Sequence, residues 1–545
     1  MKDYRKAVAE IANRRYVICV LLTVLVAYGF AAFNPTISVD DLLVDYYIGS
    51  GQNMLGAGRF TMTLLGRLFN YTGSLPPNSY AIDLVAVAAF VWAAVNYCVL
   101  FRRICGDRFT DSAAVLFSCA LISYPLIIEI WEYTAANLNV TLGYLMSSFA
   151  LLLVYDFLHG KRDWWYLAAA AVLLMFICAG YESLVVVYIF CVFGILFLQA
   201  GWGDPDARKV KTIILRGLCY AAVLLAGLVL KVLVHRLLLV VCGVPAVTNG
   251  AREIFWFTRA PGEVLLTMLA GIFSKIFLKS IIYFPITELV LCCVAFFVTG
   301  ILLCRKRGAG ILLPWAGMLL SLFLLPLLQG SGPAYRTCQV YGVFVAFVLA
   351  LAAMALDNLP FPKVRAAAFF LAGFLCLHQA IYVSHFLSLN HYRSEAENNI
   401  VADMGYDLQR YNTQNKPVIF VGSYYLSEDI VEAASIPEAS LRWKLYRNIN
   451  RKLWEITGLE WLNSAANIRQ LPETVVQSVI SFGEFCPGQI SMKSLFSYNG
   501  YDYISADCDR YYESAVRFVE ENAIPAFPAA GYIADMGECV VIHLG

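Results

Sequence analysis

Charged residues are scarce in this chain of 545 residues. Asp, Glu, Lys and Arg together make up 14% of it, whereas a soluble globular protein contains about 25%. Apolar residues reach 60%, so the composition excludes an ordinary soluble protein and indicates a polytopic membrane protein. The 40 basic and 39 acidic residues nearly balance, so nothing in the net charge favours a nucleic-acid partner.

Metal-binding and repeat signatures are also absent. The sequence contains no Cys-x-x-Cys, no His-Glu-x-x-His and no cluster of its six His, so we expect no metal site built by the protein alone. No repeat of fixed period is present. Most of the 16 Cys lie in apolar runs, where a thiol is a small apolar side chain. Among Cys486, Cys508 and Cys539, one disulfide is compatible with the spacing.

Apolar runs long enough to cross about 30 Å of hydrocarbon recur as far as Phe386. We expect about eleven helical spans, near residues 17–33, 80–101, 113–128, 138–158, 165–179, 184–200, 213–241, 284–303, 311–328, 341–356 and 366–385. Basic clusters precede the first span and then fall in alternate loops, which the positive-inside rule makes cytoplasmic. The N-terminus is therefore expected inside and the C-terminus outside. A cleaved signal peptide is the alternative interpretation of the first span.

The composition changes after His385. Segment 389–545 is richer in polar residues and contains short apolar runs at 417–422 and 539–543 that are typical of strands. Helices are predicted at 395–411 and 511–521. We therefore expect a small soluble α/β domain outside the membrane at 389–545, following a transmembrane domain at 1–388.

The first exterior loop, residues 34–79, carries the most distinctive cluster of polar residues. It places two adjacent carboxylates, Asp40 and Asp41, shortly after the first span. It then runs through Gly58-Arg59-Phe60 into an apolar segment interrupted by Arg67, which predicts an amphipathic helix along the membrane boundary. Because ionised groups are costly beside apolar surroundings, the acidic pair is expected to have a partner or a task, although a solvated loop or a helix cap is the plain alternative.

Other ionisable residues are expected on the same exterior side. The acidic ones are Glu129, Glu132 and Glu182, and the basic ones are Lys231, His235, Arg259 and Arg336. Lys231 and His235 are four residues apart and so share one face of the seventh span, although a Lys there can also simply reach toward the headgroups. Carboxylates beside several cations suit a reaction in which a base deprotonates a hydroxyl while cations neutralise a departing phosphate. Trp131 can stack on a sugar or belong to the interfacial aromatic belt.

The motifs taken in order resemble a known family. An Asn-Pro exit from the first span, the Asp-Asp pair, Gly-Arg-Phe and a Gly180-Tyr181-Glu182 turn are similar to those of the bacterial glucosyltransferases that decorate O-antigens. That family belongs to the GT-C class of polytopic glycosyltransferases, which use polyprenyl-phosphate sugars. The resemblance covers roughly residues 16 to 382, and it departs at Ala179-Gly180-Tyr181-Glu182, where relatives tend to read Gly-Ile-Tyr-Gln.

The resemblance implies a GT-C-like catalytic domain at 1–388. It also implies that a hexose, with glucose as the expected sugar, is transferred with inversion to a cell-surface glycan outside the bacterial cytoplasmic membrane. Asp40 or Asp41 would be the catalytic base. The donor phosphate would bind Arg59, Lys231, His235 and Arg336, and the acceptor sugar would meet Glu129, Trp131, Glu132 and Glu182. The donor would be a polyprenyl-phosphate sugar supplied with the help of a flippase and a polyprenyl-phosphate glucosyl synthase. No resident cofactor is implied, and the residues leave open whether a divalent metal takes part.

Two other classes of membrane protein remain as alternatives. A flippase or transporter of lipid-linked sugars would also present cations to lipid phosphates, but paired repeats and charged residues at mid-membrane, which such proteins show, are not evident. A polysaccharide polymerase or ligase shares the lipid-phosphate chemistry but usually has its large loop late in the membrane part.

Overall fold

The computed structural model describes most of the chain, and all structural statements below refer to that part. The described residues are 2–34, 36, 38, 42, 52–69, 79–131, 133–160, 163–203, 205–247, 254–274, 286–332, 334–358, 360–411, 413, 415–424, 435–436, 440–467, 471–472, 480 and 486–545. Asp40, Asp41 and Glu132 lie outside them.

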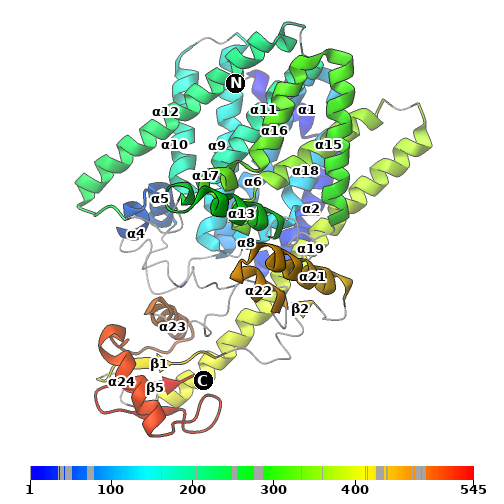
Figure 1. Cartoon of the computed structure of the whole chain (residues 1–545). Helices are drawn as coiled ribbons and strands as arrows, with labels where there is room; N and C mark the ends of the chain where they lie inside the picture. Colours follow the sequence, from blue (N-terminus) through cyan, green and yellow to red (C-terminus); the bar gives the residue numbers. More distant parts are fainter. Residues whose placement is uncertain are drawn as a thin grey trace.

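A bundle of helices forms the larger part of the molecule, with the N-terminus at the end opposite the C-terminal region (Figure 1). Its helices are α1 (Lys2–Ile11), α2 (Arg14–Phe33), α4 (Gln52–Gly56), α5 (Phe60–Leu68), α6 (Ser79–Cys105), α7 (Asp111–Ser123), α8 (Ile128–Trp131), α9 (Thr134–Leu158), α10 (Trp165–Gly180), α11 (Leu184–Trp202), α12 (Val210–Cys242), α13 (Pro261–Ile272), α15 (Ile286–Arg307), α16 (Leu312–Leu322), α17 (Leu324–Gln329), α18 (Val340–Leu356) and α19 (Pro362–Leu408). Short 3₁₀ turns are η2 (Gly106–Arg108), η3 (Pro125–Ile127), η4 (Pro205–Arg208), η6 (Phe255–Phe257), η8 (Ala309–Ile311) and η9 (Tyr335–Thr337).

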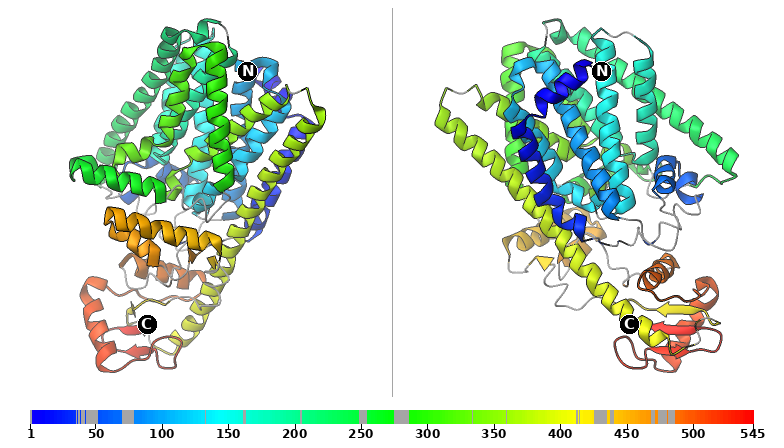
Figure 2. Two further views of the ribbon diagram at one scale, coloured as in Figure 1. Left: turned by 45° about the vertical axis from the view of Figure 1, so that its right-hand side comes forward. Right: turned by 180° about the vertical axis from the view of Figure 1, so that it is seen from behind.

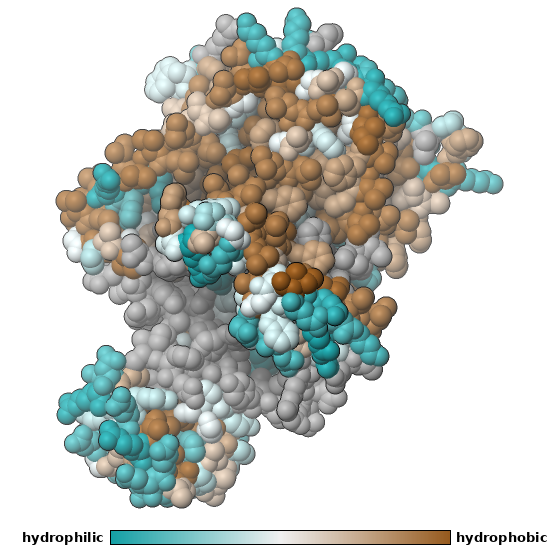
Figure 3. All heavy atoms as spheres, in the orientation of Figure 1, coloured by the Kyte–Doolittle hydropathy of each residue, from teal (hydrophilic) through white to brown (hydrophobic). Residues whose placement is uncertain are grey.

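Each predicted span coincides with one helix or with successive helices. Among the described residues, 8 helices are long and apolar enough to cross a membrane, and the predicted spans at 165–179, 311–328 and 341–356 coincide with shorter apolar helices. On the face drawn in Figure 3, apolar side chains cover the bundle between its two ends, as expected for a protein embedded in a membrane. One apolar helix, α13, was not predicted from the sequence; it lies across the end of the bundle that faces the C-terminal region (Figure 2).

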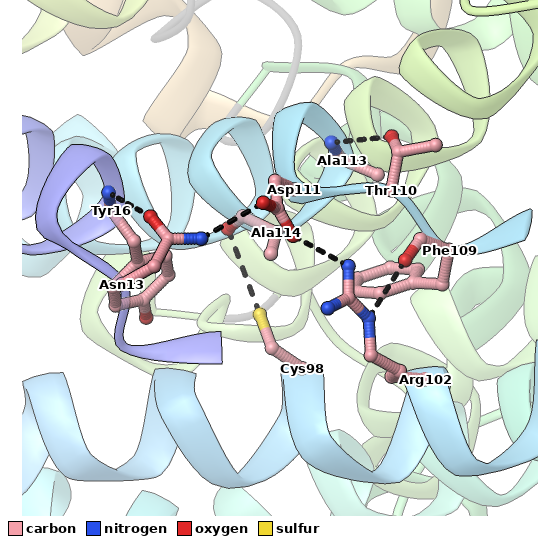
Figure 4. A network of polar contacts seen from close by, with 9 residues as sticks. All are labelled: Asn13, Tyr16, Cys98, Arg102, Phe109, Thr110, Asp111, Ala113 and Ala114. Atoms are coloured by element: carbon pink, nitrogen blue, oxygen red, sulfur yellow. Dashed lines mark hydrogen bonds and ion pairs between the residues drawn. The ribbon is translucent and has the colours of Figure 1, made fainter. Parts of the chain in front are cut away.

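The end of the bundle that holds the N-terminus is tied together by polar contacts (Figure 4). Arg102 of α6 donates to the Asp111 carboxylate at 2.7 Å, and Asn13 donates to the other oxygen of that carboxylate at 2.9 Å. Asn13 and Thr110 also cap the first turns of α2 and α7. These contacts fix the starts of α2 and α7 against α6. Basic residues end α6 and α15, and α15 runs toward this same end (Figure 1).

One carboxylate is buried among the spans. Glu288, in the first turn of α15, is 3% exposed and accepts a hydrogen bond of 2.7 Å from Gln379 of α19. Ser123 of α7 donates to the same amide at 3.0 Å. No pattern in the sequence predicts this group. The hydrogen bonds among the three side chains join α7, α15 and α19, which is a structural role.

α19 leads out of the bundle into the C-terminal region. Its 47 residues span about 70 Å, more than twice the hydrocarbon thickness, and the predicted boundary at 388/389 lies inside it. Beyond it lie β1 (Val418–Val421), β2 (Ser435–Ile436), α21 (Leu441–Thr457), α22 (Glu460–Asn467), β3 (Leu471–Pro472), α23 (Cys486–Tyr498), α24 (Cys508–Glu521), β4 (Ile533–Asp535) and β5 (Val540–His543).

The predicted C-terminal strands and helices are present. The main sheet has the order β1-β5-β4, with β1 parallel to β5 and β4 antiparallel to it. One face packs on α19 and α23 through a cluster that includes Val401, Phe420 and Phe496, and the other face packs on α24. Leu42 of the first loop is buried in the same cluster as Val401, so this loop reaches the C-terminal region. Cys539 is a free thiol.

The hairpin of α21 and α22 packs on the bundle instead of on the sheet. Trp443 and Tyr446 of α21 are buried in the hydrophobic core of the bundle. Ser274, which follows α13, donates a buried hydrogen bond of 2.9 Å to Asn450 of α21. Figure 2 shows the hairpin beneath α13, between the bundle and the sheet.

Candidate functional site

The turn between α4 and α5 presents Arg59 at the end of the bundle that faces the C-terminal region. The Gly58 N–H donates to Leu55 O at 2.9 Å and the Arg59 N–H donates to Met54 O at 2.8 Å. Gly58 has a φ of 78°, a conformation that costs any other L-residue about 1–2 kcal/mol. This backbone places Arg59 at the N-cap position of α5, with its side chain half-buried.

Helix α12 holds that turn from the side. His235 is hydrogen-bonded through Nε2 to Leu55 O at 2.9 Å, and since a carbonyl only accepts, Nε2 is the donor. Lys231, one turn earlier on the same face, lies so close that a Cβ added to Gly58 would be 3.1 Å from its Nζ. The two residues therefore share one face of α12, as their spacing predicts, and this face contacts the α4–α5 turn.

Apolar packing and one further hydrogen bond seat the turn on α10. Leu55 and Phe60 form a small cluster with Met175 and Ala179 of α10. The Thr61 hydroxyl donates to Phe176 O at 2.8 Å. The position of Arg59 is thus fixed by contacts with two long helices.

The Gly180-Tyr181-Glu182 turn between α10 and α11 supplies a carboxylate to the site, that of Glu182. Glu182 lies 3.5 Å from Lys231 Nζ, with 40% of the Glu182 side chain exposed and 16% of the Lys231 side chain exposed. A Cβ on Gly180 would be 3.3 Å from Asn139 Oδ1, so α10 ends in close contact with α9. The ion pair links the turn to α12.

Arg336 approaches from the segment between α17 and α18. Its guanidinium lies 5.7 Å from the centre of the Tyr133 ring, within range of a cation–π contact. The buried side chain of Gln339 donates to Arg336 O at 2.8 Å and accepts from Ser183 at 3.1 Å. Gln339 therefore couples the backbone of Arg336 to the start of α11.

These segments surround one cavity of about 370 Å³. Its charged lining residues are Arg59, Glu182 and Arg336, and its apolar lining includes Met54, Met62, Ile130 and Leu325. With Lys231 beside Glu182, three cations and one carboxylate of the described part of the chain lie at this place. Two arginines at one cavity suit an anionic ligand, because each can offer a planar pair of donors to phosphate oxygens.

The other sequence-predicted residues fall in different places. Trp131 is 5% exposed and packs on Tyr28 with ring centres 4.3 Å apart, so its ring lies in the core of the bundle. Glu129 lies half-buried on α8. Arg67 lies in the last turn of α5, the helix that Arg59 precedes, and is exposed. Asp40, Asp41 and Glu132 lie outside the described residues, so their roles stay predictions.

Gln339 and Gly58 contribute to the site without having been predicted as site residues. Gln339 is three residues from Arg336, but nothing in its surroundings distinguishes it from any other polar residue at the start of a span. Gly58 could have been found, because Gly-Arg-Phe was noted as a motif and a glycine in such a turn often has a positive φ. No group of three or more His, Cys, Asp or Glu that could hold a metal ion occurs among the described residues.

The chain matches the model of one protein family. The family model described as Glucosyl transferase GtrII matches residues 29–353, which include Arg59, Glu182, Lys231, His235 and Arg336. The match covers more than half of the chain and ends before α19 and the C-terminal region. No curated protein and no solved structure matches the chain.

Proposed function

The chain belongs to the GtrII glucosyl transferase family, as the sequence resemblance predicted, and we propose that it transfers glucose from a polyprenyl-phosphate donor to a cell-surface glycan, the O-antigen, outside the bacterial cytoplasmic membrane. The observation that carries this proposal is the convergence of Arg59, Arg336 and the Lys231–Glu182 pair at one cavity inside the matched region. The cavity lies at the end of the membrane bundle, where a lipid phosphate would be found.

The charge change of the reaction explains why cations belong there. The donor phosphate is a diester with one negative charge, and it leaves as a monoester that carries about −1.5 to −2 at neutral pH. As the acceptor oxygen attacks the anomeric carbon, the electron pair of the breaking C–O bond passes to the phosphate. Arg59, Arg336 and Lys231 therefore stabilise the transition state more than the bound donor, which is the condition for accelerating the reaction.

The proton of the acceptor hydroxyl needs a base. Asp40 and Asp41 are the candidates, since they follow the first span and share the loop that carries Arg59. A carboxylate that takes the proton during attack allows direct displacement with inversion, without a covalent sugar intermediate. Glu182 is held by Lys231, so its role is to orient that lysine beside the phosphate.

A reconstituted assay tests the proposal. Purified protein in detergent is expected to transfer radiolabelled glucose to O-antigen polysaccharide when the donor is polyprenyl-phosphate glucose, and not when the donor is UDP-glucose. The control is protein that has been heat-inactivated. Transfer from UDP-glucose at an equal rate, in the absence of any lipid-linked sugar, would rule out the proposed donor.

Gly58→Ala tests the geometry of the α4–α5 turn. Alanine would be strained at a φ of 78°, and its Cβ would press on Lys231, so the turn should shift and transfer should fall roughly tenfold for a strain of about 1–2 kcal/mol. Gly29→Ala is the matched control, since a Cβ there has nothing within 4 Å. Steady-state kinetics at varied donor concentration measure the effect. Equal rates of transfer for both variants would show that the turn does not position Arg59 for the reaction.

A further inference from the structure

A second cavity, of about 300 Å³, lies beside the first. Ser331 and Gly332 line both, so a single short segment separates them. This segment is seated directly on α13, because a Cβ added to Gly271 would lie 2.4 Å from the Gly332 Cα. The volume is at the lower end of the range of about 300–1,000 Å³ found for small-molecule sites.

The walls of the second cavity come from the bundle and from the C-terminal region together. Phe255 and Arg259 come from η6 and the residues that follow it, Thr267 from α13, and Trp461 from α22. Trp461 is held there by the α21–α22 hairpin, which the buried Trp443 and the Ser274–Asn450 hydrogen bond anchor to the bundle. Trp461 lies outside the region matched by the family model.

The chemistry of this lining differs from that of the first cavity. The Arg259 guanidinium lies 4.5 Å from the centre of the Phe255 ring and 3.5 Å from Glu263, so its charge is largely balanced. The Thr267 hydroxyl is buried and has no hydrogen-bond partner among the residues that the structure describes. A buried hydroxyl without a partner is costly, and such a group at a cavity wall points to a ligand that supplies the missing hydrogen bond.

We propose that the second cavity binds a sugar residue of the acceptor glycan, with Trp461 stacking on the sugar ring and Thr267 hydrogen-bonding to one of its hydroxyls. Aromatic faces with neutral hydrogen-bonding groups suit an uncharged carbohydrate, whereas the cationic first cavity suits the donor phosphate. A glycan lying across Ser331 and Gly332 would bring a neighbouring hydroxyl to the donor. This inference rests on the proposed function and deepens it.

Acceptor-dependent kinetics of Trp461→Ala and Thr267→Val test the inference, with polysaccharide from the envelope of the source bacterium as the acceptor. Both variants should raise the acceptor KM, Trp461→Ala by about tenfold, and leave kcat and the donor KM near wild-type values. Trp461→Phe, which keeps an aromatic face, should recover most of the loss. Ile456→Ala, exposed on α21 of the same hairpin, is the control.

Thr267→Val separates binding from folding. Because the hydroxyl has no partner in the described part of the chain, replacing it with a methyl group of similar shape should not destabilise the fold. An increased acceptor KM would therefore report on the ligand. An unchanged acceptor KM in Thr267→Val and in folded Trp461→Ala, or an equal rise in the donor KM, would overturn the inference. If wild-type protein transfers no glucose at all, the proposed function itself fails, which is a different outcome.

Discussion

Replacing both Asp40 and Asp41 with Asn is expected to lower the rate of glucosyl transfer by a factor of about 10² to 10⁴, the range over which a positioned general base contributes. Asn keeps the size and polarity of the side chain but cannot accept the proton of the attacking hydroxyl. Donor binding should change little, because in our proposal the cations hold the phosphate, so the loss should appear in kcat. Transfer by purified variants at saturating donor and acceptor measures it.

The single variants show which carboxylate is the base. One of Asp40→Asn and Asp41→Asn should reproduce most of the loss, and the other should have a smaller effect. Asp163→Asn is the control, because Asp163 is exposed at the end of α10 opposite the Glu182 turn. If the double variant transferred glucose at the rate of this control, the base would have to be sought among other carboxylates.

Arg59→Gln and Arg336→Gln are each expected to lower kcat by about 10² to 10³, the loss typical of removing one group that stabilises developing charge. Gln still donates hydrogen bonds but carries no charge, so the variant isolates the electrostatic contribution. Both arginines line the cavity from different segments, and their removal should affect the same step. Initial rates at varied donor concentration separate kcat from KM.

Arg67→Gln provides the matched control for these variants. It removes the same charge from the neighbouring helix α5, but Arg67 is exposed and is not among the residues lining the cavity. Equal losses in all three variants would mean that the arginines act through the general positive potential of this surface and not through the cavity.

The membrane architecture could be predicted from the sequence because it depends on local features. A run of apolar residues long enough to cross the bilayer is visible without any tertiary information, and every predicted span coincides with one helix or with successive helices. The grouping of Arg59, Lys231, His235 and Arg336 followed from their expected side of the membrane. Their distances to one another did not, because these depend on how α5, α12 and η9 pack.

The parts that were missed depend on contacts between distant segments. α13 is a helix of 12 residues, too short to be read as a span. The α21–α22 hairpin is polar enough to look like part of a soluble domain, yet Trp443 and Tyr446 pack in the bundle core. Trp131 looked like a sugar-stacking residue, but its ring packs on Tyr28, a residue more than 100 positions earlier. No local pattern distinguishes these outcomes.

Binding of polyprenyl phosphate to the purified protein tests the central claim most directly, because this product carries the phosphate that the cavity should hold. Titration calorimetry in detergent would compare wild type, the double variant Arg59→Gln/Arg336→Gln and the control Arg67→Gln. We expect the double variant to bind at least about 100-fold more weakly, a loss of about 2.8 kcal/mol, and the control to bind like wild type. Equal affinity of the double variant and wild type would contradict the assignment of this cavity to the donor phosphate.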